Sequence, residues 1–293
     1  MWLYATVDGV GNGRKLDRLC REHDAYKWLC GGVTLNYHTL NDFRVAHEQA
    51  LDELMTRVVA ALTAQGVVRV ERITQDGRRV RASAGNSSFH REATLQRHLA
   101  QTRAYIEELK QQADDEPAEA ARQRAARERA AREKQARLEQ ALALLPELRA
   151  AQDNPRNSKQ QRQKPVRVSS TDPEARKMKM GDGGIRPAYN PPRRTTGGGH
   201  GIRRGGRALV GVDVVNTPGT TAWRQRMQTE AAREIYKQRA AVSETINAET
   251  KCRFGVRAFA VRGLRKVRCV VLWMALAYNL LHFAQELLRC EVV

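Results

Sequence analysis

Residues 208–215 read Ala-Leu-Val-Gly-Val-Asp-Val-Val, a short and nearly continuous apolar run. Such a run, rich in β-branched residues, is typical of a strand that is buried on both faces. The segment that follows it, Trp223–Lys251, predicts a long helix that Gly255 should end. Residues 264–288 then predict a final, mostly apolar helix. The C-terminal part of the sequence therefore predicts one buried strand followed by two long helices.

Toward the N-terminus, residues 1–64 predict a set of short helices. The last of them should be capped by Asn41 or Asp42 and ended by Gly66. The β-branched stretch 67–73 predicts a strand.

Asp76-Gly77 has the composition of a turn, and residues 79–82 predict a second strand that returns beside the first.

The middle of the chain changes in composition. Residues 88–150 are rich in Ala, Arg, Glu and Gln and predict a pair of solvated helices, the second beginning near Pro117. A basic helix that faces DNA is the alternative. Residues 151–166 are polar and predict a linker. Residues 188–190 predict a strand, and Pro191-Pro192 with the glycines that follow should disrupt any strand after it.

The charge balance points to a polyanionic partner. The chain has 293 residues, with 51 Lys and Arg against 32 Asp and Glu, a net charge of +19. Residues 151–207 alone hold fourteen basic and four acidic side chains. Nucleic acids and membrane surfaces are both polyanionic. The apolar stretch 267–284 is interrupted by Arg268, Asn279 and His282, so it predicts a buried helix and no membrane anchor.

Cysteine usage favours free thiols in a reducing cytoplasm. The five cysteines are scattered, none forms a Cys-x-x-Cys pair, and an odd number is a poor disulfide framework. The same spacing argues against a zinc site. The N-terminal residues lack the basic start and apolar core of a signal peptide.

Four residues of the predicted helix 223–251 form the most specific pattern, namely Tyr236, Arg239, Glu244 and Lys251. With them, the sequence resembles the insertion-sequence DDE (Asp-Asp-Glu) transposases that carry a Tyr-Arg-Glu-Lys signature. Four residues separate Arg239 from Glu244, where three are usual. We expect helical geometry to tolerate the difference, because both spacings should keep the pair roughly on one side of the helix. Other stretches resemble the same family and extend the likeness over most of the chain: residues 28–33, 36–40, 76–84, 171–176 and 261–264.

The resemblance implies an α/β fold of the ribonuclease-H-like kind, in which helices flank a mixed sheet. Here the sheet should be incomplete, with an N-terminal helical domain and a long helical insertion. Residues 1–64 should form a DNA-end-binding domain, and residues 65–87 the first strands of the catalytic domain. Residues 88–150 should form the helical insertion, and residues 151–168 a basic linker. The rest of the catalytic domain should span residues 169–293.

The family's active site uses three carboxylates that hold two divalent ions, Mg²⁺ or Mn²⁺. The ions activate a water or a 3′-hydroxyl and stabilise the leaving oxygen of a phosphodiester, and such ions prefer oxygen ligands. By resemblance, Asp76 is the first carboxylate and Glu244 is the helical one, so both are expected to be catalytic metal ligands. Tyr236, Arg239 and Lys251 are expected to contact DNA phosphates. The alternatives are an Asp-Gly turn and an exposed helical glutamate.

The second aspartate of the family has no counterpart. It should lie on a further strand after residues 208–215, but the sequence runs through Thr217-Pro218-Gly219 directly into the Trp223 helix. The resemblance therefore implies an internal deletion, and also an N-terminus that begins inside the family's helical region. Asp213 is the nearest carboxylate and matches a strand residue of the family.

Three functions remain open at this point. The first is a bacterial, cytoplasmic transposase that binds the terminal inverted repeats of its element as double-stranded DNA, as a possible homo-oligomer and without a membrane. This copy would be catalytically defective. The second is a DNA-binding remnant without catalysis. The third is a coiled-coil scaffold built on residues 88–150, which leaves the flanking motifs unexplained.

Overall fold

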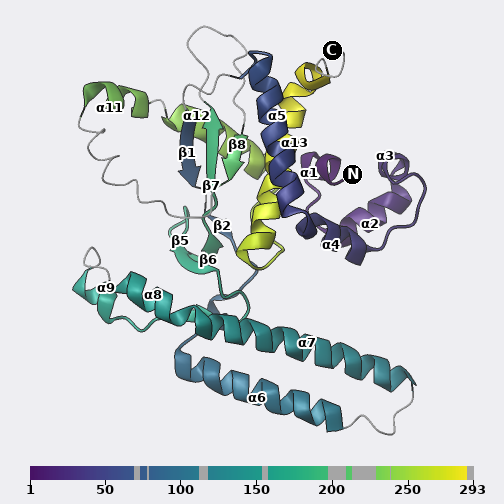
Figure 1. Ribbon diagram of the computed structural model, residues 1–293, viewed down its shortest axis with the longest axis vertical. Helices are drawn as coiled ribbons and strands as arrows, with labels where there is room; N and C mark the ends of the chain where they lie inside the picture. The colour runs from purple at the N-terminus through teal and green to yellow at the C-terminus, as the bar shows by residue number, and fades with distance from the viewer. Residues whose placement is uncertain are drawn as a thin grey trace. The chain divides into compact units, whose positions relative to one another are not determined.

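A computed structural model describes residues 1–68, 73–77, 79–111, 118–153, 158–196, 209–212, 229–237 and 239–288. The chain divides into two compact units (Figure 1). The first unit joins the two ends of the chain, Met1–Val80 and Asn190–Val293, and the second consists of Arg81–Tyr189.

The first unit combines helices with one small sheet. Its helices are α1 (Trp2–Val7), α2 (Gly13–Glu22), α3 (Asp24–Leu29), α4 (Tyr37–Ala46), α5 (Glu48–Ala64), α11 (Glu230–Lys237), α12 (Arg239–Cys252) and α13 (Leu264–Leu288). Its strands are β1 (Ile73–Gly77), β7 (Pro192–Thr196) and β8 (Leu209–Val212).

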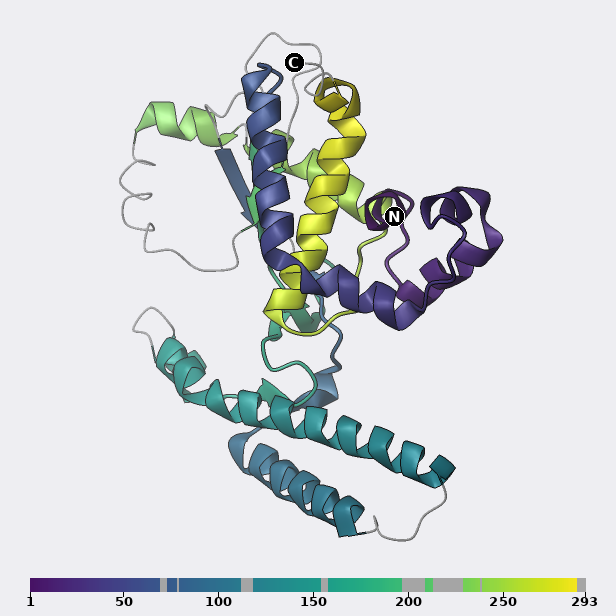
Figure 2. The ribbon, with the colours of Figure 1, turned by 45° about the vertical axis from the view of Figure 1, so that its right-hand side comes forward.

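The apolar helix α13 is the core of the first unit. It contacts α1, α4, α5 and β8, and two views show it alongside α5 (Figures 1 and 2). In the described part of the chain α13 is long and apolar enough to cross a membrane, but 72% of its most apolar window is buried inside the protein. The helix expected at residues 264–288 is confirmed over Leu264–Leu288, with a kink at Phe283, and its burial is that of a core helix.

Two tryptophans tie α13 and α1 to α4. The indole N–H of Trp273 donates to the carbonyl of Arg44 (3.0 Å), and that of Trp2 donates to the carbonyl of Leu40 (2.9 Å). The Arg44 guanidinium lies over the Trp2 ring (4.7 Å) and donates to Gly11 O (2.5 Å). Burial lowers the pKa of Arg44 to about 10. The N-terminal helices therefore pack on the C-terminal helix.

Local signals set several helix ends. The side chain of Asn12 accepts from Arg14 N at the start of α2, and Asn36 does the same for His38 N at the start of α4. The expected cap at Asn41 or Asp42 is wrong, because both residues lie inside α4. After α5, Gly66 has a φ of +69°, a conformation that favours glycine and ends the helix as predicted.

The sheet of the first unit is antiparallel, in the order β1-β7-β8. The interpretation of Asp76-Gly77 as a turn is wrong, because both residues lie in β1 and pair with β7. The expectation that Pro191-Pro192 would disrupt a strand is also wrong. Pro192 is the first residue of β7, where a proline is tolerated. The strand predicted at residues 208–215 is confirmed over Leu209–Val212, which form β8.

The second unit is a helical hairpin joined to small sheets. Its helices are α6 (Glu92–Gln111), α7 (Ala118–Ala143), α8 (Leu145–Gln152) and α9 (Lys159–Gln163), with a 3-10 turn at Asn86–Ser88. Its strands are β2 (Val80–Arg81), β3 (Phe89–His90), β4 (Val168–Ser169), β5 (Arg176–Lys179) and β6 (Ile185–Tyr189). They form a β2-β6-β5 sheet and a β3-β4 pair. The return strand predicted at 79–82 therefore pairs with β6 and not with β1.

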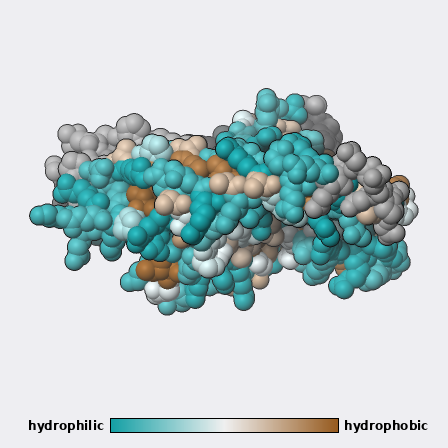
Figure 3. All heavy atoms as spheres, turned by 90° about the horizontal axis from the view of Figure 1, so that it is seen from below, coloured by the Kyte–Doolittle hydropathy of each residue, from teal (hydrophilic) through white to brown (hydrophobic). Residues whose placement is uncertain are grey.

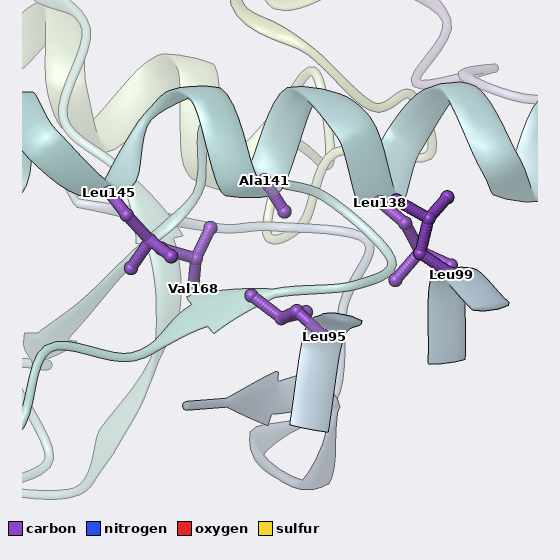
Figure 4. Close-up of a cluster of buried hydrophobic side chains, with 6 residues drawn as sticks. All are labelled: Leu95, Leu99, Leu138, Ala141, Leu145 and Val168. Atoms are coloured by element: carbon purple, nitrogen blue, oxygen red, sulfur yellow. The ribbon is translucent and has the colours of Figure 1, made fainter. Parts of the chain in front are cut away.

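The helix pair predicted at 88–150 is confirmed, and its core is compact. Figure 4 shows that α6, α7, α8 and β4 all contribute to it. The buried side chains are Leu95, Leu99, Leu138, Ala141, Leu145 and Val168. The stretch 151–166, predicted to be a linker, contains the short helix α9, while Pro117 lies outside the described residues.

The described residues are therefore mostly helical, with small antiparallel sheets, and are consistent with an α/β domain. The parallel strands of a ribonuclease-H-like sheet stay a prediction. The four described cysteines are free thiols, as expected.

Candidate functional site

The two elements that carry the predicted carboxylates lie against each other. Asp76 is in β1 and Glu244 is in α12, and α12 contacts both β1 and β7. Figure 1 shows α12 beside this sheet. The side chains of Asp76 and Glu244 lie outside the described residues, so the meeting of the two carboxylates stays a prediction.

The position of Asp76 is set by the register of β1. Asp76 lies opposite Arg193, and Gly77 lies opposite Pro192. A Cβ at Gly77 would come within 2.6 Å of Oδ1 of Asn190, so glycine allows the close approach next to Asp76. The resemblance predicts that Asp76 lies on or just beyond the central strand. In the described sheet β7 is central and β1 is at an edge, because β7 pairs with both of its neighbours.

The four residues of the signature lie on α11 and α12, and residue 238 between them is outside the described residues. Tyr236 is near the end of α11, and Arg239 is the first residue of α12. At about 100° per residue, Arg239 and Glu244 lie roughly 140° apart around the axis of α12. The expectation that the longer spacing keeps this pair on one side is therefore wrong. Lys251 is exposed and lies two turns after Glu244.

The C-terminal half of α12 is fixed by side chains that the sequence did not single out. Ile246 and Thr250 are buried, with 1% and 0% of their surface exposed. Both carboxylate oxygens of Glu249 lie 3.0 Å from Nε2 of His282 in α13, and Arg253 lies 3.7 Å from the same carboxylate. The contact between Glu249 and His282 joins α12 to α13. No short-range pattern indicates this contact, because His282 is distant in sequence.

Asp172, one of the two carboxylates of the 171–176 stretch, is part of a buried hydrogen-bond network in the second unit. It is fully buried, and Oδ1 accepts a hydrogen bond from the hydroxyl of Tyr189 (2.5 Å). The hydroxyl of Ser169 accepts from the backbone N–H of Thr171 (3.1 Å) and of Asp172 (3.0 Å). This network joins the loop after β4 to β6.

We expect Tyr189→Phe to lower the free energy of unfolding of the second unit by about 1–3 kcal/mol, because the buried Asp172 loses a donor. Urea denaturation of the full chain, followed by circular dichroism, measures the change. The matched control is Tyr105→Phe in the same unit, where the tyrosine is 42% exposed and the cost should stay within about 0.5 kcal/mol. Equal effects of the two substitutions would contradict a structural role for the Asp172–Tyr189 pair.

A metal centre is not visible among the described side chains, where no group of three or more His, Cys, Asp or Glu residues could hold an ion. Asp213 and the side chains of Asp76 and Glu244 lie outside that set. The fit of a divalent ion therefore depends on the contact between β1 and α12, which brings two oxygen-ligand positions into one region.

Residues 208–284 match the transposase DDE domain. The match supports a DDE transposase family for this chain. No curated protein and no solved structure matches it.

The part that matches the DDE domain extends from β8 through α11 and α12 into α13. It includes Tyr236, Arg239, Glu244 and Lys251, and it ends before the last turn of α13. Asp76 precedes the matched residues, so its assignment as the first carboxylate depends on the resemblance and on the contact of β1 with α12. Domains of this kind generally depend on divalent metals.

Proposed function

We propose that this chain is a transposase of a bacterial insertion sequence that binds double-stranded DNA at the element's inverted repeats and that is defective in catalysis. The match of residues 208–284 to the transposase DDE domain carries the proposal. The antiparallel order β1-β7-β8, with α12 against β1, is compatible with the first part of a ribonuclease-H-like sheet.

The proposed site would use Asp76 and Glu244 as oxygen ligands for Mg²⁺ or Mn²⁺. When bound, a pair of such ions activates the attacking oxygen and stabilises the leaving oxygen of a phosphodiester. Tyr236, Arg239 and Lys251 would orient the DNA through its phosphates, since a guanidinium matches phosphate geometry and a lysine acts as a point charge.

The length of one connection supports the proposed loss of catalysis. β8 ends at Val212 and α11 begins at Glu230. A strand–helix–strand unit takes roughly 30 residues, so the interval is short for the further helix and strand that would carry the second aspartate. A two-metal site needs bridging and terminal carboxylates. The alternative, a DNA-binding remnant without any catalysis, is favoured by the same observation.

DNA binding should be mainly electrostatic, because the chain carries a net charge of +19. We expect the logarithm of the association constant K for DNA to fall linearly with the logarithm of the salt concentration. Each phosphate contact should contribute about 0.9 to the slope. Titration of a labelled duplex at several salt concentrations measures the slope, and a scrambled duplex of equal length separates sequence preference from charge. An affinity that does not change with salt would contradict the proposal, as would no binding at low salt.

A further inference from the structure

The helical hairpin of the second unit has two grooves between α6 and α7. One groove, of about 300 Å³, is lined by Arg103, Ile106, Glu107, Lys110, Arg132 and Gln135. The other, of about 330 Å³, is lined by Gln101, Thr102, Tyr105, Arg127, Ala130, Ala131 and Lys134. Both are built from the same two helices, so their charges can be compared directly.

The basic side chains of the first groove are compensated by carboxylates. Arg103 pairs with Glu139 (2.9 Å), Lys110 pairs with Glu107 (2.6 Å), and Arg132 pairs with Glu128 (2.5 Å). Each pair places a negative charge within hydrogen-bond distance of the positive one. This groove therefore offers little net charge to a polyanion.

The second groove holds two cations and no acidic lining residue. Arg127 and Lys134 are exposed, and no carboxylate of the described residues pairs with either of them within 4.0 Å. Tyr105 is 42% exposed on the facing helix, where it and Gln101 offer hydrogen-bond donors. Figure 3 shows one face of the molecule, which is largely hydrophilic with smaller hydrophobic patches.

The spacing of the two cations suits a DNA backbone. Arg127 and Lys134 are seven residues apart on α7, which is about 10 Å along the helix axis. Both side chains are long and flexible, so their charged ends can adjust this separation to reach two phosphates of one strand. Both positive charges can therefore contact phosphates of the same strand, and the tyrosine hydroxyl and glutamine amide can donate to neighbouring phosphate oxygens.

We propose that the groove of Gln101, Tyr105, Arg127 and Lys134 binds the phosphate backbone of duplex DNA. The inserted hairpin is then a second DNA contact, outside the unit that carries β1 and α12. This proposal rests on the proposed DNA binding of the chain and adds to it a named surface. The contact reads no bases, because phosphates carry no sequence information.

The test is a comparison of two double variants of the full chain. The first is Arg127→Gln with Lys134→Gln in the uncompensated groove. The second is Arg132→Gln with Lys110→Gln in the compensated groove. Both remove one arginine and one lysine, so they change the net charge equally. Circular dichroism checks that both fold, and fluorescence anisotropy with a labelled duplex gives the affinity between 50 and 200 mM salt, roughly the range over which such binding weakens steeply.

We expect the first variant to lower the slope of log K against log salt by about 1.8, the contribution of two phosphate contacts. Its affinity near 0.1 M salt should fall on the order of tenfold or more. The control variant should keep the wild-type slope within about 0.5. Arg127→Lys, which keeps the charge, should retain most of the affinity.

Equal losses in the two double variants would overturn the groove proposal, because net charge alone would then explain the binding. In that case the wild type still binds DNA, and the proposed function stands. A wild-type chain that does not bind duplex at low salt would overturn both proposals. Binding of the wild type to anionic lipid vesicles but not to duplex would likewise overturn both.

Discussion

The purified chain, incubated with Mg²⁺ and a duplex that carries an element end, is expected to leave both strands uncut. Two-metal cleavage needs carboxylates that bridge the two ions and hold each of them. The resemblance assigns only Asp76 and Glu244 to that role. Enzymes accelerate their reactions by about 10⁶-fold or more. The rate of strand cleavage should therefore differ clearly between an intact site and this one. Denaturing gels of an end-labelled duplex measure strand cleavage directly.

Two further conditions sharpen this prediction. Mn²⁺ is less demanding of its ligands than Mg²⁺, so a trace of nicking with Mn²⁺ is compatible with an incomplete site. Asp76→Asn and Glu244→Gln should remove any such trace. Robust Mg²⁺-dependent nicking by the wild type would contradict the prediction and would require another carboxylate. Asp213→Asn would then be tested first, because Asp172 is buried against Tyr189.

Trp273→Ala is expected to lower the free energy of unfolding of the first unit by about 3–5 kcal/mol. Trp273 is 8% exposed in the core helix α13, and its indole N–H donates to the carbonyl of Arg44. The substitution leaves a cavity and removes a donor from a buried carbonyl. Urea denaturation gives the loss, and hydrogen exchange of the α5 and α13 amides shows that the affected transition belongs to the first unit.

A matched control for this prediction lies in the same unit. Trp28 is 82% exposed, so Trp28→Ala should change the free energy of unfolding by no more than about 0.5 kcal/mol. Trp273→Phe keeps much of the ring volume and should cost about 1–3 kcal/mol through the lost donor. A Trp273→Ala protein as stable as the Trp28→Ala protein would show that α13 is not the core of this unit.

The helices could be predicted from the sequence because their signals are local. Apolar spacing places residues 264–288 in one helix, and the composition of residues 88–150 predicts the helix pair. A helix forms its backbone hydrogen bonds within itself, so its sequence contains most of the information for its existence. Its exact ends are less determined, as the misplaced cap at Asn41 shows.

The strands were predicted less well because a strand forms its hydrogen bonds with a partner that is distant in sequence. Nothing near Pro192 indicates that β7 will become the central strand of its sheet. The partner of β2 is β6, more than a hundred residues away, and the adjacent β1 pairs elsewhere.

The same distinction applies to the candidate site. The resemblance to DDE transposases, carried by short stretches of sequence, selected Asp76, Glu244 and Lys251 as expected site residues, and the apolar run predicted the strand at β8. Only the tertiary structure decided that α12 lies against β1, that Asp172 is buried against Tyr189, and that Arg127 and Lys134 share a groove without a carboxylate. The physical reason is that contacts between distant segments depend on how several elements pack together. The spacing of apolar residues within one segment does not determine that packing.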